Sequence, residues 1–114
     1  MELADIILMI NINIKSSRIR IENLFKSIFS NIPNTSIHFE DHSVVIKHND
    51  PVNADSASIE IIENNYGYKI SYWDGYSLAE EESLKDLNKA LKVFKRYSKK
   101  LGKNLMRFTD NSIS

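Results

Sequence analysis

The chain has 114 residues, of which 42% are hydrophobic and 26% are charged, with three glycines and two prolines. This length and composition are typical of one globular domain with a single core, and they exclude intrinsic disorder as the main state. Cysteine does not occur in the sequence, which excludes disulfides, cysteine-ligated metals and a thiol nucleophile, and which fits a cytoplasmic location.

Two further features of the sequence bear on location. No apolar run reaches the roughly 18 residues of a membrane span. The first ten residues include Glu2 and Asp5, where a signal peptide would carry positive charge. We therefore expect neither insertion into a membrane nor secretion through a signal peptide.

The net charge of zero conceals an uneven distribution along the chain. Residues 1–37 carry four basic and three acidic groups. Residues 38–86 carry three basic and eleven acidic groups, and residues 87–114 carry eight basic groups and one acidic group. The middle and the end of the chain are therefore expected to attract partners of opposite charge.

The first third of the chain shows a strand pattern followed by a helix pattern. Over residues 6–15, isoleucine and leucine alternate with other side chains, which predicts a β-strand. Over residues 21–32, apolar side chains recur at helical spacing and are followed by Pro33. These residues predict a helix over residues 18–31.

The middle of the chain contains two hairpin patterns. TSIHFE and SVVIKH flank Asp41 and His42 with a period of two, which predicts a hairpin over residues 35–48. The polar segment 49–55 is expected to be a loop. A second hairpin is predicted over residues 57–73, because SASIEII and YKISYW flank a turn sequence that contains Gly67.

The last part of the chain is predicted to be a helix that begins near Ser77. Ser77 followed by Glu80 matches the capping box, in which two side chains satisfy backbone N–H groups of the first turn. Leucine and phenylalanine recur on one face as far as Leu101, and Gly102 stands where a C-cap is expected. Residues 104–114 are assigned to a C-terminal tail.

Together these elements predict an α+β fold in a single domain over residues 1–103. We expect an antiparallel sheet of about five strands with two helices on one face, in the order β-α-β-β-β-β-α. The partner of the first strand and the order of the strands stay open, because one sequence reveals periods but no pairings.

Histidines and carboxylates cluster in the first predicted hairpin. His38, His42 and His48 lie among them, and imidazoles and carboxylates are ligands for zinc and similar ions. However, a turn at residues 41–42 places His38 opposite Val45, so the two strand histidines are expected about 10 Å apart. No serine-nucleophile motif or glycine-rich phosphate loop occurs. We therefore expect no enzyme, no bound metal and no cofactor.

A basic stripe marks the predicted C-terminal helix. Its six cations recur at spacings of three and four residues: Lys85, Lys89, Lys92, Arg96, Lys99 and Lys103. Such a stripe can follow a phosphate backbone or lie on an anionic membrane. The opposing interpretation is a solvated helix face balanced by the acidic middle of the chain, because a neutral protein lacks the overall attraction typical of nucleic-acid-binding proteins.

The segment from Asn64 to Glu82 concentrates aromatic residues among carboxylates. It holds four of the five tyrosines and the only tryptophan. Strand parity places Tyr72 in the core, whereas Trp73 and Tyr76 are expected to be exposed. Tyrosine and tryptophan are frequent in interface hot spots, and an acidic field attracts a basic partner. In the opposing interpretation the aromatics only fill the core and the carboxylates keep the protein soluble.

The element pattern of residues 35–101, which includes YKISYWDGYSLAEEESLKDLNKALKVFKRY, resembles that of the small immunity proteins of bacterial polymorphic toxin systems, including contact-dependent growth inhibition. The resemblance implies a cytoplasmic, non-catalytic protein that binds the toxin domain of its cognate effector and blocks its active site. Such toxins are often nucleases with basic clefts. The partner-binding residues expected on the acidic surface are Glu40, Asp41, Asp55, Glu60, Glu63, Trp73, Asp74 and Tyr76. The alternative is a small nucleic-acid-binding or regulatory domain that uses the basic C-terminal helix.

Overall fold

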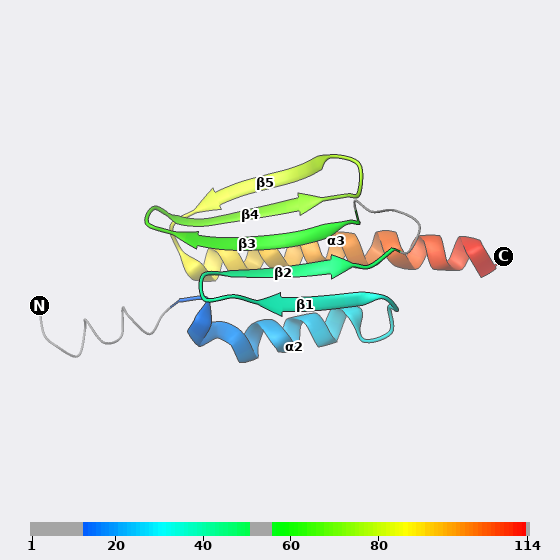
Figure 1. Cartoon of the computed structure of the whole chain (residues 1–114), viewed down its shortest axis with the longest axis horizontal. Helices are drawn as coiled ribbons and strands as arrows, with labels where there is room; N and C mark the ends of the chain where they lie inside the picture. The colour runs from blue at the N-terminus through cyan, green and yellow to red at the C-terminus, as the bar shows by residue number, and fades with distance from the viewer. Residues whose placement is uncertain (1–12, 51–55, 114) are drawn as a thin grey trace, which may run out of the picture.

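The computed structural model describes residues 13–50 and 56–113 of the chain (Figure 1). These residues form one antiparallel sheet, two α-helices and a short 3-10 helix, η1 (Lys15–Ser17). The five strands lie side by side in sequence order: β1 (Thr35–Phe39), β2 (Ser43–His48), β3 (Ser58–Asn64), β4 (Gly67–Trp73) and β5 (Leu78–Leu84). The helices are α2 (Arg18–Phe29) and α3 (Leu87–Ile113). The predicted α+β class, with five antiparallel strands and two helices, is confirmed.

The two predicted hairpins are present, with the predicted register where one was given. In the first hairpin His38 pairs with Val45, and Thr35 pairs with His48. In the second hairpin Ile61 pairs with Ile70, and the strands turn between Asn64 and Gly67. Hence the alternation of side chains in the sequence becomes an alternation between the two faces of the sheet.

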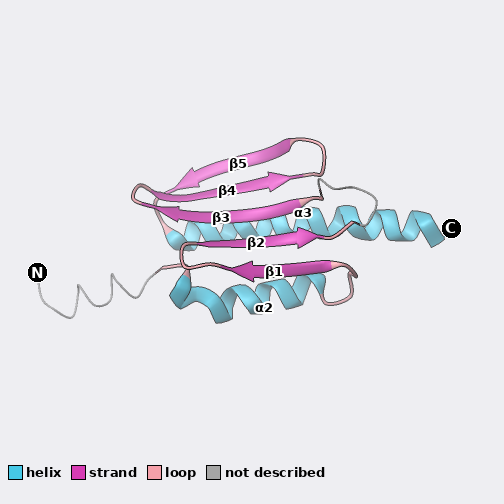
Figure 2. Cartoon of the chain, viewed as in Figure 1, coloured by secondary structure: helices cyan, strands magenta, loops and turns pink. Residues whose placement is uncertain are grey.

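One face of the sheet forms the core with both helices. Its buried side chains come from the three central strands: Val44, Ile46, Ile59, Ile61, Ile70 and Tyr72. α3 lies against β3, β4 and β5, and α2 lies against β1 and α3, on the same side of the sheet (Figure 2). The helix predicted over residues 18–31 is confirmed as α2, which ends two residues earlier, and it buries Ile21 and Phe29.

The predicted helix start at Ser77 is wrong, because residues 78–84 form the edge strand β5. Asp74 and Gly75 begin a hairpin turn in which the Asp74 carboxylate accepts hydrogen bonds from the backbone N–H groups of Tyr76 and Ser77, both at 2.8 Å. The Asp74 N–H in turn donates to the Ser77 carbonyl over 3.1 Å. Ser77 therefore closes a turn between two strands instead of capping a helix.

The sequence of β5 contains good helix formers, but its tertiary contacts favour a strand. β5 pairs with β4 and forms the edge of the sheet, and in this pairing Tyr72 lies opposite Glu80 and Ile70 lies opposite Glu82. Both glutamates therefore lie on the helix side of the sheet, where Lys100 and Arg96 of α3 meet them. Edge pairing and these ion pairs together override the helix propensity of the segment.

The helix α3 begins and ends later than the sequence predicts. Its N-cap is Asp86, whose carboxylate accepts a hydrogen bond from the Lys89 N–H over 3.2 Å, while its carbonyl accepts from the Ala90 N–H over 2.9 Å. Gly102 is not a C-cap, since α3 continues to Ile113. The residues assigned to a tail, 104–113, are thus helical, and Gly102 is buried inside the helix.

The predicted strand over residues 6–15 lies largely outside the described residues. Its last residues form a turn and the start of η1, where the Ser17 N–H donates to the Ile14 carbonyl over 3.0 Å. The fifth strand of the described sheet is therefore β5, which had been predicted as the first turns of a helix.

Candidate functional site

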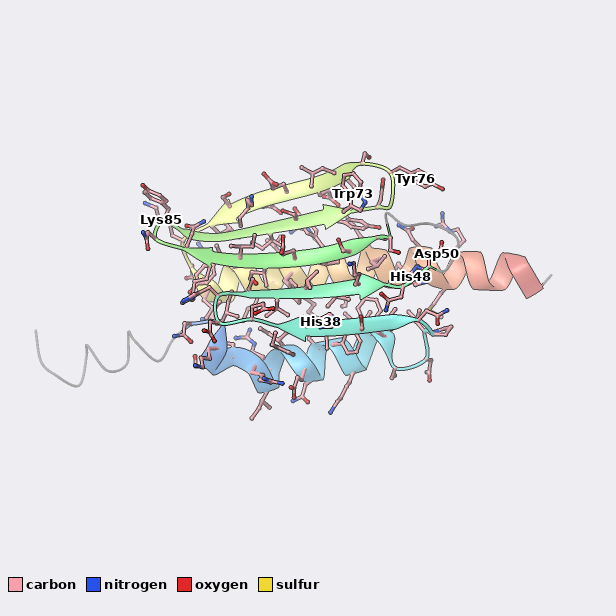
Figure 3. All side chains as sticks on the ribbon, viewed as in Figure 1. His38, His48, Asp50, Trp73, Tyr76 and Lys85 are labelled. Atoms are coloured by element: carbon pink, nitrogen blue, oxygen red, sulfur yellow. The ribbon has the colours of Figure 1, made fainter. Side chains whose placement is uncertain are left out.

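The sheet face that points away from α2 and α3 is covered by no other described element, and we call it the open face (Figure 3). Each of the five strands places one serine on it: Ser36, Ser43, Ser58, Ser71 and Ser83. Three half-buried apolar side chains lie between them: Val45, Ile62 and Trp73.

One row of paired residues crosses the open face through all five strands. It runs in the order His38, Val45, Glu60, Ser71 and Glu81. The Ser71 hydroxyl donates to the Glu81 carboxylate over 3.2 Å. Since adjacent strands lie about 4.8 Å apart, the two carboxylates of this row stand roughly 10 Å apart and can meet two cations of a partner.

An aromatic and acidic corner adjoins the open face at the β4–β5 turn (Figure 3). Tyr76 at this corner is 88% exposed, as predicted, and Tyr72 is buried in the core, as predicted. Trp73 lies on the open face, on the opposite side of β4 from Tyr72 as predicted, but it is half-buried and not exposed as expected. The backbone hydrogen bonds from Tyr76 and Ser77 lower the pKa of Asp74, which keeps this carboxylate charged.

The eight predicted partner-binding residues do not form one surface. Trp73, Asp74 and Tyr76 lie at the β4–β5 turn, whereas Glu40 and Asp41 lie in the β1–β2 turn at the opposite end of the sheet. Glu60 lies on the open face between the two ends. Asp55 lies outside the described residues.

Glu63 makes internal contacts on the helix side of the sheet, where it lies opposite Tyr68. Its carboxylate accepts a hydrogen bond from the Ile14 backbone N–H over 3.3 Å and lies 3.1 Å from His42 Nδ1. Burial and this carboxylate together raise the pKa of Tyr68 to about 12. Glu63 therefore ties the start of the described chain to β3, which argues against its predicted place in a partner-binding surface.

The histidines do not come together. His38 points to the open face, whereas His48 shares the side of Ile46 and thus faces the helices (Figure 3). His42 lies in the turn beside Glu63. Among the described residues, no group of three histidine, aspartate or glutamate side chains could hold a metal ion.

The predicted basic stripe is divided by the fold. Lys85 precedes α3 and lies at the far end of the sheet from Trp73 (Figure 3). Arg96 binds Glu82, and its guanidinium carbon lies 5.5 Å from the centre of the Tyr97 ring. Burial, followed by the hydrogen bond to Glu82, raises the pKa of Tyr97 to about 12. Lys100 binds Glu80. The cations on this side of α3 therefore hold β5 in place.

Sequence reasoning missed three residues of the open face: Val45, Ile62 and Glu81. With a period of two, Val45 falls on the same side as Ser43 and Lys47, and Ile62 falls on the same side as Ser58 and Glu60. An apolar residue on the polar side of a strand was the available signal. Glu81 could not be found, because the segment was predicted to be helical.

The comparisons with known proteins add no relative to this description. No protein-family model, no curated protein and no solved structure matches the chain. In the described part of the chain, neither helix combines the length and the apolar character that crossing a bilayer requires.

Proposed function

We propose that the chain is a non-catalytic, cytoplasmic inhibitor of the immunity type, which holds a basic toxin domain, such as a nuclease, against its open face. The observation that carries this proposal is the open face itself, with three half-buried apolar side chains spread over it and its central row of carboxylates. A sheet face with small side chains around a tryptophan suits close docking of a protein surface.

The composition of this face supports a protein partner. Tryptophan and tyrosine concentrate binding energy when a partner covers them, and Trp73 and Tyr76 lie together at one corner. An interface of standard size buries about 1,600 Å² in total, or about 800 Å² on each partner. Docking centred on the row of Glu60 and Glu81 would reach this corner.

The charges of the surface support a basic partner. Glu60 and Glu81 are part-exposed or exposed on the face, and Asp74 lies at its corner. Lys47 and Lys69 lie on the rows on either side of this row of carboxylates. A partner with cations only at the centre of its surface therefore fits better than a uniformly positive one, because it avoids the two lysines. Complementary charges of this kind accelerate association more than they add affinity.

The first test identifies the partner and its activity. The tagged chain is used to capture protein from its native host, with and without nuclease treatment, and a stoichiometric partner that survives the treatment is expressed alone. We expect this partner domain to stop growth when it is expressed without the chain. Co-expression of the wild-type chain should restore growth. A partner that is harmless, or growth that is not restored, would overturn the immunity function.

Charge reversal then tests the surface. At low salt, E60K/E81K should slow association with the partner by about tenfold or more, because two attractive contacts become repulsive. The matched control is E40K/D41K, which makes the same change in net charge in the β1–β2 turn, outside the open face, and it should change the rate by less than about twofold. Equal slowing by both pairs would contradict the open face as the binding surface.

A further inference from the structure

A groove runs between α2 and α3 on the side of the helices that faces away from the sheet. Its walls combine residues of both helices: Arg20, Ile21, Asn23, Leu24, Ser27, Leu91, Lys92 and Lys95. The space between them is about 420 Å³. The floor contains leucine and isoleucine, while the rim carries cations together with amide and hydroxyl groups.

The cations at this groove differ from those on the β5 side of α3. Lys100 and Arg96 are held by Glu80 and Glu82. In contrast, no ion pair within the described part of the chain involves Lys92, Lys95 or Lys99. Arg20, on the facing helix, donates to the uncharged Asn88 side chain over 3.0 Å. The positive charge of the groove is therefore available to a ligand.

The same positive charge continues along α3. At 100° per residue, four lysines fall within an arc of about 80° of the helix surface: Lys92, Lys95, Lys99 and Lys103. From first to last they span roughly 17 Å at about 1.5 Å per residue. One strand of a nucleic-acid duplex presents about five phosphates over this length, at about 3.4 Å each.

We propose that the α2–α3 groove and the lysine arc beside it bind the phosphate backbone of a nucleic acid. Lysines on α3 and Arg20 on α2 supply the charge, and the Asn23 side chain supplies an amide N–H that can donate to a phosphate oxygen. The Ser27 hydroxyl already donates to the Leu24 carbonyl over 2.8 Å. This site lies on the opposite side of the molecule from the open face, so it is independent of the proposed toxin binding.

The shape of the site favours a nucleic acid over a bilayer. A concave groove with cations on both walls accommodates a linear polyanion, whereas an interfacial helix inserts an apolar face into lipid. The apolar face of α3, which includes Leu91, Phe94 and Leu101, is already buried in the core. Arg20 and Lys92 together would place positive charge on both sides of the bound strand.

The experiment measures binding of fluorescein-labelled single-stranded RNA, single-stranded DNA and duplex DNA, each of about 30 nucleotides, by anisotropy from about 0.05 to 0.2 M salt. The test variant is K92Q/K95Q/K99Q. The matched control, K47Q/K69Q/K85Q, removes the same charge from the sheet side. Circular dichroism and unfolding midpoints verify that both variants fold. A competition arm adds vesicles of 30% phosphatidylserine and 70% phosphatidylcholine.

We expect the wild-type chain to bind at least one nucleic acid with an affinity that falls steeply as salt rises. The test variant should bind about tenfold more weakly or worse, and its log–log salt slope should be shallower by about two for a single strand. The control should lose less than about twofold. Equal loss in both variants, no saturable binding at about 0.05 M salt, or binding to vesicles alone would overturn the proposal.

Discussion

Gly102 shows at the level of one residue how the two helices approach each other. A Cβ atom built on Gly102 would lie 2.9 Å from Ile28 Cγ2 of α2, which is closer than side-chain packing allows. Glycine costs an α-helix about 1 kcal/mol relative to alanine. Its place in the middle of α3 is therefore explained by close helix packing rather than by a helix end.

A double-mutant cycle tests this explanation. We expect G102A to lower the free energy of unfolding by about 1 kcal/mol, since overpacking by one methyl group outweighs the gain in helix propensity. In the I28A background, where the opposing methyl group is gone, the same substitution should be neutral or stabilising. Denaturant unfolding monitored by circular dichroism provides all four values. Stabilisation of the wild-type background by G102A would contradict the close contact.

At the level of elements, β5 depends on its contacts with α3. Its carboxylates alternate between the two faces, so that Glu82 faces the helix and Glu81 faces the open side. Glu82 accepts hydrogen bonds from Arg96 and from the Tyr97 hydroxyl, the latter over 3.0 Å. Inward carboxylates on an edge strand thereby bind the sheet to the helix layer.

Neighbouring glutamates of β5 provide a matched comparison. E82Q should destabilise the protein by about 1 kcal/mol, because the side chains of Arg96 and Tyr97 lose a charged acceptor. E81Q removes the same charge from the next residue and should change stability by less than about 0.5 kcal/mol. Thermal unfolding at neutral pH gives both values. Equal effects of the two substitutions would show that the contact with α3 does not hold β5.

These elements also show what the sequence could and could not predict. The hairpins and α2 were predictable, because hydrophobic periods report directly on the faces of strands and helices. β5 was not, because Leu78–Leu84 combines good helix formers with an apparent capping box, and pairing with β4 together with the ion pairs to α3 overrides them. The Asp74–Gly75 pair was the available hairpin signal.

The sequence predicted which types of residue form the candidate site, but it did not predict which of those residues lie together. Parity along β4 correctly separated Tyr72 from Trp73. Proximity along the chain could not reveal that Glu63 faces the helices, nor that Glu40 lies at the other end of the sheet from Asp74. Those positions depend on strand pairings, and pairings bring together residues that are distant in sequence.

At the level of the whole molecule, the uneven charge of the sequence becomes a difference between two sides. The acidic middle of the chain builds the sheet and its turns, and the basic end builds α3. The hydrophobic core lies between the open face and the helix side. The molecule can therefore offer a protein-binding open face and a separate polyanion-binding helix side.

One labelling experiment tests this central claim most directly. Because the chain contains no cysteine, S71C on the open face and S27C on α2 each provide a single thiol for a bulky maleimide. Labelled S71C should lose binding to the captured toxin domain and retain nucleic-acid binding, while labelled S27C should do the reverse. Binding of the toxin domain by labelled S71C with unchanged affinity would contradict the assignment of the open face.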